Sequence, residues 1–153
     1  MVIMFPLLVR SMVVTLIFFS SAHANLGNLN NSDSNNSKII KGKAALQEES
    51  WSTAIKLFEE ALAGQPNSAD IHNFLGYAHR KSGDINKALE HYEMALDINP
   101  DHKSTLEYLG EAYISLGNLE LANAQLDRLK SLCATIPCEE LNELEQALLR
   151  AAK

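Results

Sequence analysis

The chain has 153 residues, enough for one domain, and 46% of them are hydrophobic and 21% charged. Its formal net charge of -6 at neutral pH gives no general attraction for phosphate backbones, so we do not expect nucleic acid as a partner. Two cysteines are too few for a small protein built on disulfides. The composition is that of an ordinary globular protein, and its many alanines and leucines favour helices.

The first 24 residues have the pattern of a signal peptide. Residues 2–9 and 12–19 are apolar, and Ala22-His23-Ala24 matches the small-x-small pattern that signal peptidase accepts. We therefore expect cleavage after Ala24, export to the periplasm or to the outside of the cell, and no membrane attachment after processing. The alternative is an uncleaved anchor through residues 2–19, although Arg10 in the middle of a spanning helix would be costly.

Asparagine and serine dominate the stretch that follows, residues 25–37, which contains one charged residue. Such a stretch can bury almost no apolar surface, so burial cannot offset the conformational entropy that the chain loses on ordering. We therefore expect a flexible tether between the cleavage site and the folded domain.

The rest of the chain repeats itself every 34 residues. The positions that coincide comprise glycines, then alanines, then large apolar residues: Gly42, Gly76 and Gly110; Ala54, Ala88 and Ala122; Phe58, Tyr92 and Leu126. Many independent matches in one register are not expected by chance. The period therefore predicts three copies of one structural unit.

Each copy predicts a pair of helices. In the second copy the helices span about 69–82 and about 85–97, because Gly83 suits a left-handed helix end and Pro100 prevents continuation. The third copy has Gly117 at the same turn. The first has Glu49 there, so Ser50 is expected to cap the helix that carries Trp51.

The small residues allow close packing. We expect Gly76 and Ala88 where the two antiparallel helices of one copy cross. We expect the large residues Phe58, Tyr92 and Leu126 to fill the space between neighbouring copies. A single pair cannot bury its apolar face alone, so three copies must stack.

This pattern resembles the tetratricopeptide repeat family. The second copy carries it most completely, in Leu75, Gly76, Gly83, Ala88, Tyr92, Ala95 and Pro100. The resemblance implies an all-α fold: a right-handed α-solenoid whose concave groove holds a partner protein or peptide. The 34-residue units would fall at about 35–68, 69–102 and 103–134, and the folded domain that they form would span residues 38–134. A capping helix, about 139–151 within residues 135–153, would follow.

Cys133 and Cys138 lie between the last repeat helix and the predicted cap. In an exported chain we expect them to form a structural disulfide that holds the cap against the third repeat. Reduced thiols and a redox-active pair are the alternatives, although four intervening residues do not make the C-x-x-C motif.

Metal and catalytic motifs are missing from the sequence. The histidines include no H-x-x-x-H pair, and His72 and His79 are expected to face the partner helix, His79 at a core-edge position. There is no glycine-rich phosphate loop, no G-x-S-x-G and no H-E-x-x-H. We therefore expect no metal, no cofactor and no enzyme.

The expected binding site is a stripe on the first helices of the repeats, opposite their packing face. The second repeat contributes Asn73, Tyr77, Arg80 and Lys81. The period places Ile39, Lys43, Leu46 and Gln47 on one side of this stripe and Glu107, Glu111, Ile114 and Ser115 on the other. We select Tyr77 as the central anchor, because aromatic side chains often carry binding energy.

The expected function is that of an adaptor that binds a protein or peptide. Some members of the family bind a terminal carboxylate through a set of lysine and asparagine side chains. In this chain Ile39 and Lys43 occupy the first two positions of that set, so binding of a terminal carboxylate lacks support. Two other functions remain open: a self-assembling scaffold and an exported thiol/disulfide accessory protein.

Overall fold

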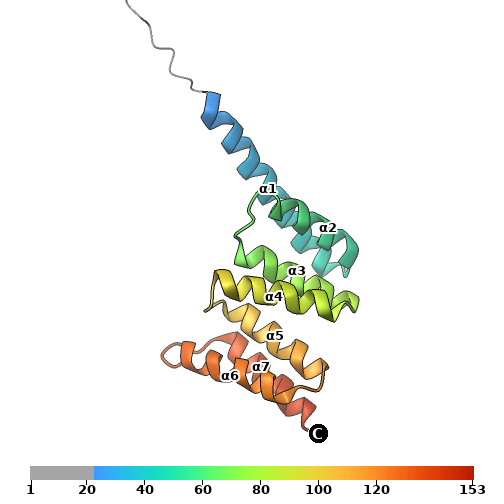
Figure 1. Ribbon diagram of the computed structural model, residues 1–153, viewed down its shortest axis with the longest axis vertical. Coiled ribbons are helices and arrows are strands. Elements are labelled where there is room, and N and C mark those ends of the chain that lie inside the picture. The colour runs from blue at the N-terminus through green and yellow to red at the C-terminus, as the bar shows by residue number, and fades with distance from the viewer. Residues whose placement is uncertain (1–22) are drawn as a thin grey trace, which may run out of the picture.

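The computed structural model describes residues 23–153, and describes side chains from residue 32 onward. Seven helices make up this part of the chain: α1 (His23–Gln47), α2 (Trp51–Leu62), α3 (Ala69–Ser82), α4 (Ile85–Ile98), α5 (Lys103–Ser115), α6 (Leu119–Leu132) and α7 (Glu139–Ala151). They stack in chain order along the long axis of the molecule (Figure 1). The all-α solenoid of three helix pairs and a seventh helix is therefore confirmed.

The predicted signal peptide, residues 1–24, lies almost entirely outside the described residues. None of the helices that the structure describes is long and apolar enough to cross a membrane. Cleavage after Ala24 stays a prediction.

The tether is where the structure departs from the expectation. Residues 25–37 belong to α1, which projects beyond α2 (Figure 1), and are not a flexible coil. Extending a helix that is already packed fixes one residue per added hydrogen bond and needs no new nucleus. Asn35 adds a tertiary contact, because its side chain is buried against Gly64 in the loop after α2.

Side chains at the helix starts accept hydrogen bonds from backbone amides that the helix itself leaves unpaired. These capping residues are Ser68, Asp84, His102 and Asn118. Ser50 stands at the predicted capping position of α2, yet its side chain accepts no such bond. The turns agree with the predicted register: Gly83 and Gly117 have φ of 93° and 74°, and Glu49, which replaces the glycine, has φ of 54°.

Each recurring glycine lies against one large side chain. A Cβ added at Gly42 would lie 2.7 Å from the Phe58 ring, and one at Gly76 would lie 2.5 Å from the Tyr92 ring. Both rings belong to the second helix of the same repeat, so the small residues do permit close helix packing. The rings also reach the next repeat: Phe58 stacks on Phe74, with centroids 5.1 Å apart.

The third repeat is different. The three atoms nearest to a Cβ at Gly110 belong to Leu144 of α7, the closest at 2.6 Å, and not to Leu126 of its own second helix. Leu126 is buried, in a cluster that also contains Leu144. Helix α7 packs against both α5 and α6, and no second helix follows it among residues 23–153 to complete a fourth pair. In the loop between α6 and α7, Cys133 and Cys138 are bonded to each other, with Cα atoms 5.7 Å apart.

Candidate functional site

The first helices of the repeats line the inner face of the solenoid. Along this face α1 contacts α3, α3 contacts α5 and α5 contacts α7, whereas α2, α4 and α6 make no contacts with one another within residues 23–153. Closer spacing on one side of a helix stack makes that side concave. We call this face the groove.

A hollow of about 320 Å³ opens in the groove across α1, α3 and α5. Its walls combine aromatic rings with neutral polar groups and a single cation: Lys43, Leu46, Gln47, Asn73, Phe74, Tyr77, Ser104 and Tyr108. Tyr77 lies at the centre of an aromatic row, because its ring centroid is 5.0 Å from that of Tyr108 and 6.3 Å from that of Trp51. The rings are partly exposed, so they can stack on a bound side chain.

Cations surround these rings. The Nζ atom of Lys43 lies 4.9 Å from the Phe74 centroid, and that of Lys81 lies 5.4 Å from the Tyr77 centroid. The guanidinium of Arg80 sits between Tyr77 and Tyr108, at 5.5 and 5.7 Å from their centroids. A cation over a ring face is attracted by the π-electrons. The structure therefore brings Lys43, Tyr77, Arg80 and Lys81 together, as the repeat register predicts.

The Arg80 side chain is largely buried, although it was predicted as an exposed residue of the groove. Only 12% of its side chain is exposed, and its Nη2 atom lies 2.7 Å from the Oε2 atom of Glu111 on α5. Both residues line a second hollow, of about 350 Å³, with Ile114, Ser115 and Arg150. The pair thus joins the second and third repeats and also forms part of the groove wall.

Two of the predicted partner-binding residues are not exposed groove residues. Asn73 and Glu107 are each only 3% exposed. The Oδ1 atom of Asn73 accepts a hydrogen bond of 3.1 Å from Thr105 Oγ1, so this side chain links α3 to α5 and only its edge reaches the hollow. A spacing of i, i+4 on a helix cannot distinguish solvent from a neighbouring helix that packs obliquely.

Glu107 does not contribute a negative charge to the groove at neutral pH. Burial, a hydrogen bond with Glu143 of α7 and the charges of Glu143, Glu111 and Glu140 together raise the pKa of Glu107 to about 9. At neutral pH the Glu107 carboxyl is therefore protonated and donates to Glu143. The exposed acidic wall of the groove lies instead on α5 and α7, where Glu111, Glu139 and Glu143 line a hollow of about 520 Å³.

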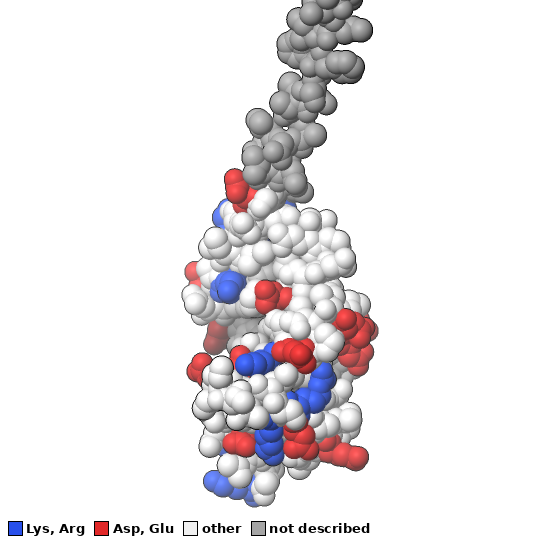
Figure 2. Space-filling model, turned by 90° about the vertical axis from the view of Figure 1, so that its left-hand side faces the viewer, with Lys and Arg blue, Asp and Glu red and all other residues white. Residues whose placement is uncertain are grey.

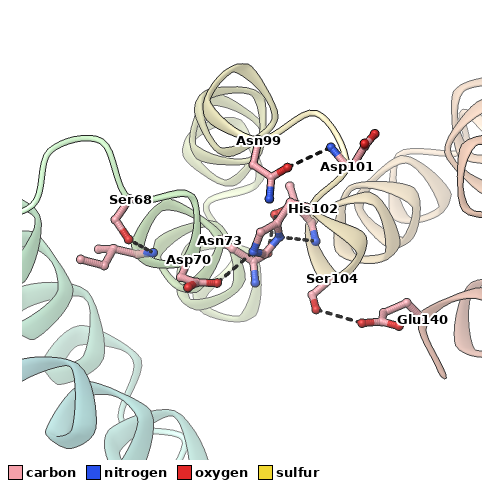
Figure 3. A network of polar contacts seen from close by, with 10 residues as sticks. Ser68, Asp70, Asn73, Asn99, Asp101, His102, Ser104 and Glu140 are labelled. Carbon is pink, nitrogen blue, oxygen red and sulfur yellow. Dashed lines mark hydrogen bonds and ion pairs between the residues drawn. The ribbon is translucent and has the colours of Figure 1, made fainter. Parts of the chain in front are cut away.

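Polar contacts join the helices at one rim of the groove (Figure 3). The Nδ1 atom of His102 accepts from the Thr105 amide at 3.2 Å, which places the ring proton on Nε2. That Nε2–H donates to Asp70 Oδ1 at 2.9 Å, and Ser104 Oγ donates to Glu140 Oε1 at 3.3 Å. These contacts link α3 to α5 and α5 to α7, and so hold together the helices that line the hollows.

Three histidines meet on the other side of α3, against α4. The Nδ1 atoms of His72 and His91 are 3.1 Å apart, and the rings of His79 and His91 stack with centroids 5.5 Å apart. Burial lowers the pKa of His91 to about 4, with contributions from His72, His79 and Lys87. The predicted packing of His72 and His79 against the partner helix is confirmed, and both are buried. The described residues contain no group of three or more side chains placed to hold a metal ion.

Charges of both signs are interspersed over one flank of the solenoid, and neither sign forms a continuous patch there (Figure 2). This flank offers no basic track of the kind that follows a nucleic acid backbone.

Sequence reasoning missed the two other aromatic rings that line the hollow with Tyr77. Phe74 and Tyr108 are one period apart, so a recurring aromatic was present in the repeat alignment next to Asn73 and Glu107. The contribution of α7 to the groove had no such signal, because α7 lies outside the repeats.

Comparisons with known proteins agree with this architecture. Two models of the tetratricopeptide repeat match residues 41–103 and 79–131. Photosystem I assembly protein Ycf3 of Cyanophora paradoxa is 32% identical over 97 residues, which cover 57% of this chain and 56% of that protein. A protein SGT1 homolog of Oryza sativa subsp. japonica is 28% identical over 118 residues, covering 68% of this chain and 32% of that protein.

Two solved structures share the fold at low sequence identity. The TPR2B domain of yeast Sti1, in complex with pHsp70, has a TM-score of 0.72 at 18% identity, covering 78% of this chain and 96% of that one. The first TPR of Spaghetti (RPAP3), bound to the HSP90 peptide SRMEEVD, has a TM-score of 0.69 at 19% identity, covering 80% and 98%. The chain spans about half the length of the Ycf3 relatives that it matches. From the two repeat models, the recurring glycines and the solenoid, we conclude that this chain belongs to the tetratricopeptide repeat family.

Proposed function

We propose that the chain is a non-enzymatic scaffold that holds an extended segment of a partner protein in its groove. The observation that carries this proposal is that three partly exposed rings, Phe74, Tyr77 and Tyr108, line the 320 Å³ hollow. Aromatic rings that remain accessible in a hollow are typical anchors of binding energy. The Sti1 and RPAP3 domains, which share this fold, were solved with pHsp70 and with an HSP90 peptide, and this supports a peptide as the partner.

The chemistry of the groove favours a segment with an apolar or aromatic residue at its centre. That residue would enter the hollow, and acidic or carbonyl groups beside it would meet Lys43 and Lys81. Basic groups would meet the wall of Glu111, Glu139 and Glu143. The hollow itself offers one cation, Lys43, which supports an internal segment over a terminal carboxylate.

The test is a comparison of variants. Proteins captured by the immobilised chain from its native compartment are identified and purified, and their affinity is measured for the wild type and for Tyr77→Ala. We expect Tyr77→Ala to weaken binding by about 2 kcal/mol with unchanged helical circular dichroism. Lys56→Ala, an exposed change on α2, is the control and leaves affinity unchanged. A partner that binds Tyr77→Ala with wild-type affinity would show that the groove is not the site.

We also propose that the scaffold works outside the cytoplasm, either in the periplasm or secreted. The support is the signal-peptide pattern that ends at Ala24, together with the Cys133–Cys138 pair, since disulfides persist in oxidising compartments. The intact mass of the protein recovered from its native source should match a chain that begins at Asn25 and contains two fewer hydrogens than the dithiol. Residues 1–24 still attached, or two free thiols, would contradict this proposal.

A further inference from the structure

The floor of the 320 Å³ hollow contains a side-chain amide that is held on its carbonyl side. Asn73 of α3 lines the hollow and is only 3% exposed, and its Oδ1 atom accepts a hydrogen bond of 3.1 Å from Thr105 Oγ1 of α5. The Thr105 hydroxyl also lies 2.7 Å from Nδ1 of His102, the N-cap of α5, in the polar network of Figure 3. Two contacts thus restrain the hydroxyl, and the hydroxyl restrains the Asn73 amide.

The nitrogen end of the same amide faces the hollow. Because Oδ1 is turned towards Thr105, the Nδ2 group is the polar part of Asn73 that reaches the hollow. Within residues 32–153 no acceptor forms a hydrogen bond with this Nδ2 group. The amide of a nearly buried side chain normally pairs at both ends, because an unpaired polar group away from water costs free energy. A molecule that enters the hollow with an acceptor beside Nδ2 therefore gains a hydrogen bond and breaks none within the protein.

Asn73 lies one helical turn from the central ring of the groove. It precedes Tyr77 by four residues on α3, so the two side chains are neighbours on one face of the helix. A partner side chain that stacks on Tyr77 therefore brings its own backbone close to Asn73. Every residue of a peptide has a main-chain carbonyl, so this polar contact requires no particular residue in the partner, whereas the rings select an apolar or aromatic one.

We propose that Thr105 is a positioning residue of the groove: it holds Asn73 so that the Nδ2 hydrogens face the hollow and bind a carbonyl oxygen of the partner segment. This inference rests on the function proposed above and adds the polar half of the recognition. Thr105 is fully buried and does not line the hollow, so it acts through Asn73. The floor of the hollow is then a hydrogen-bond donor, which favours a ligand that carries an acceptor over a purely apolar one.

Two small probes separate a ring alone from a ring with an acceptor. N,N-dimethyl-2-phenylacetamide has a ring and a carbonyl oxygen but no N–H group, and toluene has only the ring. Binding of each probe to the full chain is followed by NMR in the ring signals of Tyr77 and in the side-chain amide signals of Asn73. The wild type should bind the acetamide about tenfold more tightly than toluene, and only the acetamide should shift the Asn73 amide.

Variants assign this preference to individual residues. Asn73→Leu has a similar size and no donor, so it should bind both probes alike. Thr105→Val should reduce the preference to about threefold or less, and Thr105→Ser, which keeps the hydroxyl, should retain the preference of the wild type. Ser131→Ala removes an exposed hydroxyl of α6 and is the matched control, with the wild-type preference. Urea unfolding reports the stability of each variant, and a purely structural role of Thr105 would change both affinities by the same factor.

Three results would each overturn the proposal: equal affinities of the two probes for the wild type, no binding of the acetamide, or a preference that survives Asn73→Leu or Thr105→Val. The proposed function fails by a different result, a partner that binds Tyr77→Ala with wild-type affinity. If Tyr77→Ala loses the partner while the probe preference does not depend on Thr105, the groove remains the site and the positioning role of Thr105 is wrong.

Discussion

The guanidinium of Arg80 pairs with the carboxylate of Glu111 at 2.7 Å and so joins α3 to α5 across the groove. The Arg80 side chain is 12% exposed and that of Glu111 is 27% exposed, so water screens the pair only in part. Both residues belong to the expected partner-binding stripe, and in the structure they contact each other.

We predict that the Arg80–Glu111 pair stabilises the fold. A double-mutant cycle with Arg80→Met, which keeps the aliphatic stem, and Glu111→Gln should give a coupling energy of about 1 kcal/mol in urea unfolding. The exposed pair of Lys87 and Asp84 is the matched control, and its coupling should be close to zero. Strictly additive effects of Arg80→Met and Glu111→Gln would mean that the pair does not couple the repeats.

Gly76→Leu should destabilise the second repeat. A Cβ at this position would already lie 2.5 Å from the Tyr92 ring, which is buried and cannot move aside. The cost should be about 1–3 kcal/mol, read from the midpoint of thermal unfolding. Ala124→Leu, an exposed change in α6, is the control and should leave the midpoint in place. Equal midpoints for the two variants would exclude the close approach at Gly76.

Acid should destabilise the protein through His91. The pKa of His91 is about 4 in the folded chain and near 6.5 when unfolded, so the unfolded state binds more protons between these values. Stability contributed by neutral His91 is therefore complete above pH 6.5 and is lost as pH falls towards 4. His91→Gln should reduce this loss by about 1–2 kcal/mol in urea unfolding at pH 4.5. Parallel pH profiles for the two proteins would contradict the shift.

Glu107 should act in the opposite direction. The pKa of Glu107 is about 9 in the folded chain, so between the unfolded value of 4.5 and 9 the folded state binds more protons. Its contribution to stability is complete below pH 4.5 and is lost as pH rises through 9. Glu107→Gln, which stays neutral and can still donate to Glu143, should be more stable than the wild type at pH 8 by about 1–2 kcal/mol.

The pH dependence of that gain is the control for Glu107→Gln. Near pH 4.5 the variant and the wild type should unfold at the same urea concentration, because both carry a neutral side chain at this position. A gain of the same size at both pH values would point to packing and not to proton binding.

The helices of the repeats could be predicted because their signals are local. The period places α3 at 69–82, the φ of Gly83 is positive as the turn requires, and α7 has the predicted limits of 139–151. The position of Tyr77 in the groove could also be predicted, because the helical period places it on the face of α3 opposite the one that packs against α4. Composition and spacing were sufficient to predict those features that depend only on the helical period and the 34-residue repeat.

The errors arose where two elements without a common register meet. Asn73 and Glu107 share the helical stripe of Tyr77, yet both are buried, Asn73 against Thr105 of α5 and Glu107 against Glu143 of α7. The tether at residues 25–37 became helix because α1 continues from its packed half, which composition alone does not report. The atoms nearest to a Cβ at Gly110 belong to Leu144 of α7, a helix that the repeat pattern does not include.

The contact between Gly110 and Leu144 has a consequence for the order in which the protein opens. Gly42 and Gly76 are each covered by a ring from their own repeat, but Gly110 is covered from α7. Transient detachment of α7 therefore uncovers the interior of the third repeat while the first two stay closed. Amide hydrogens of α5 and α7 should exchange with solvent water as one cooperative unit, at a lower opening free energy than those of α3. The attachment of α7 thus sets the protection of α5.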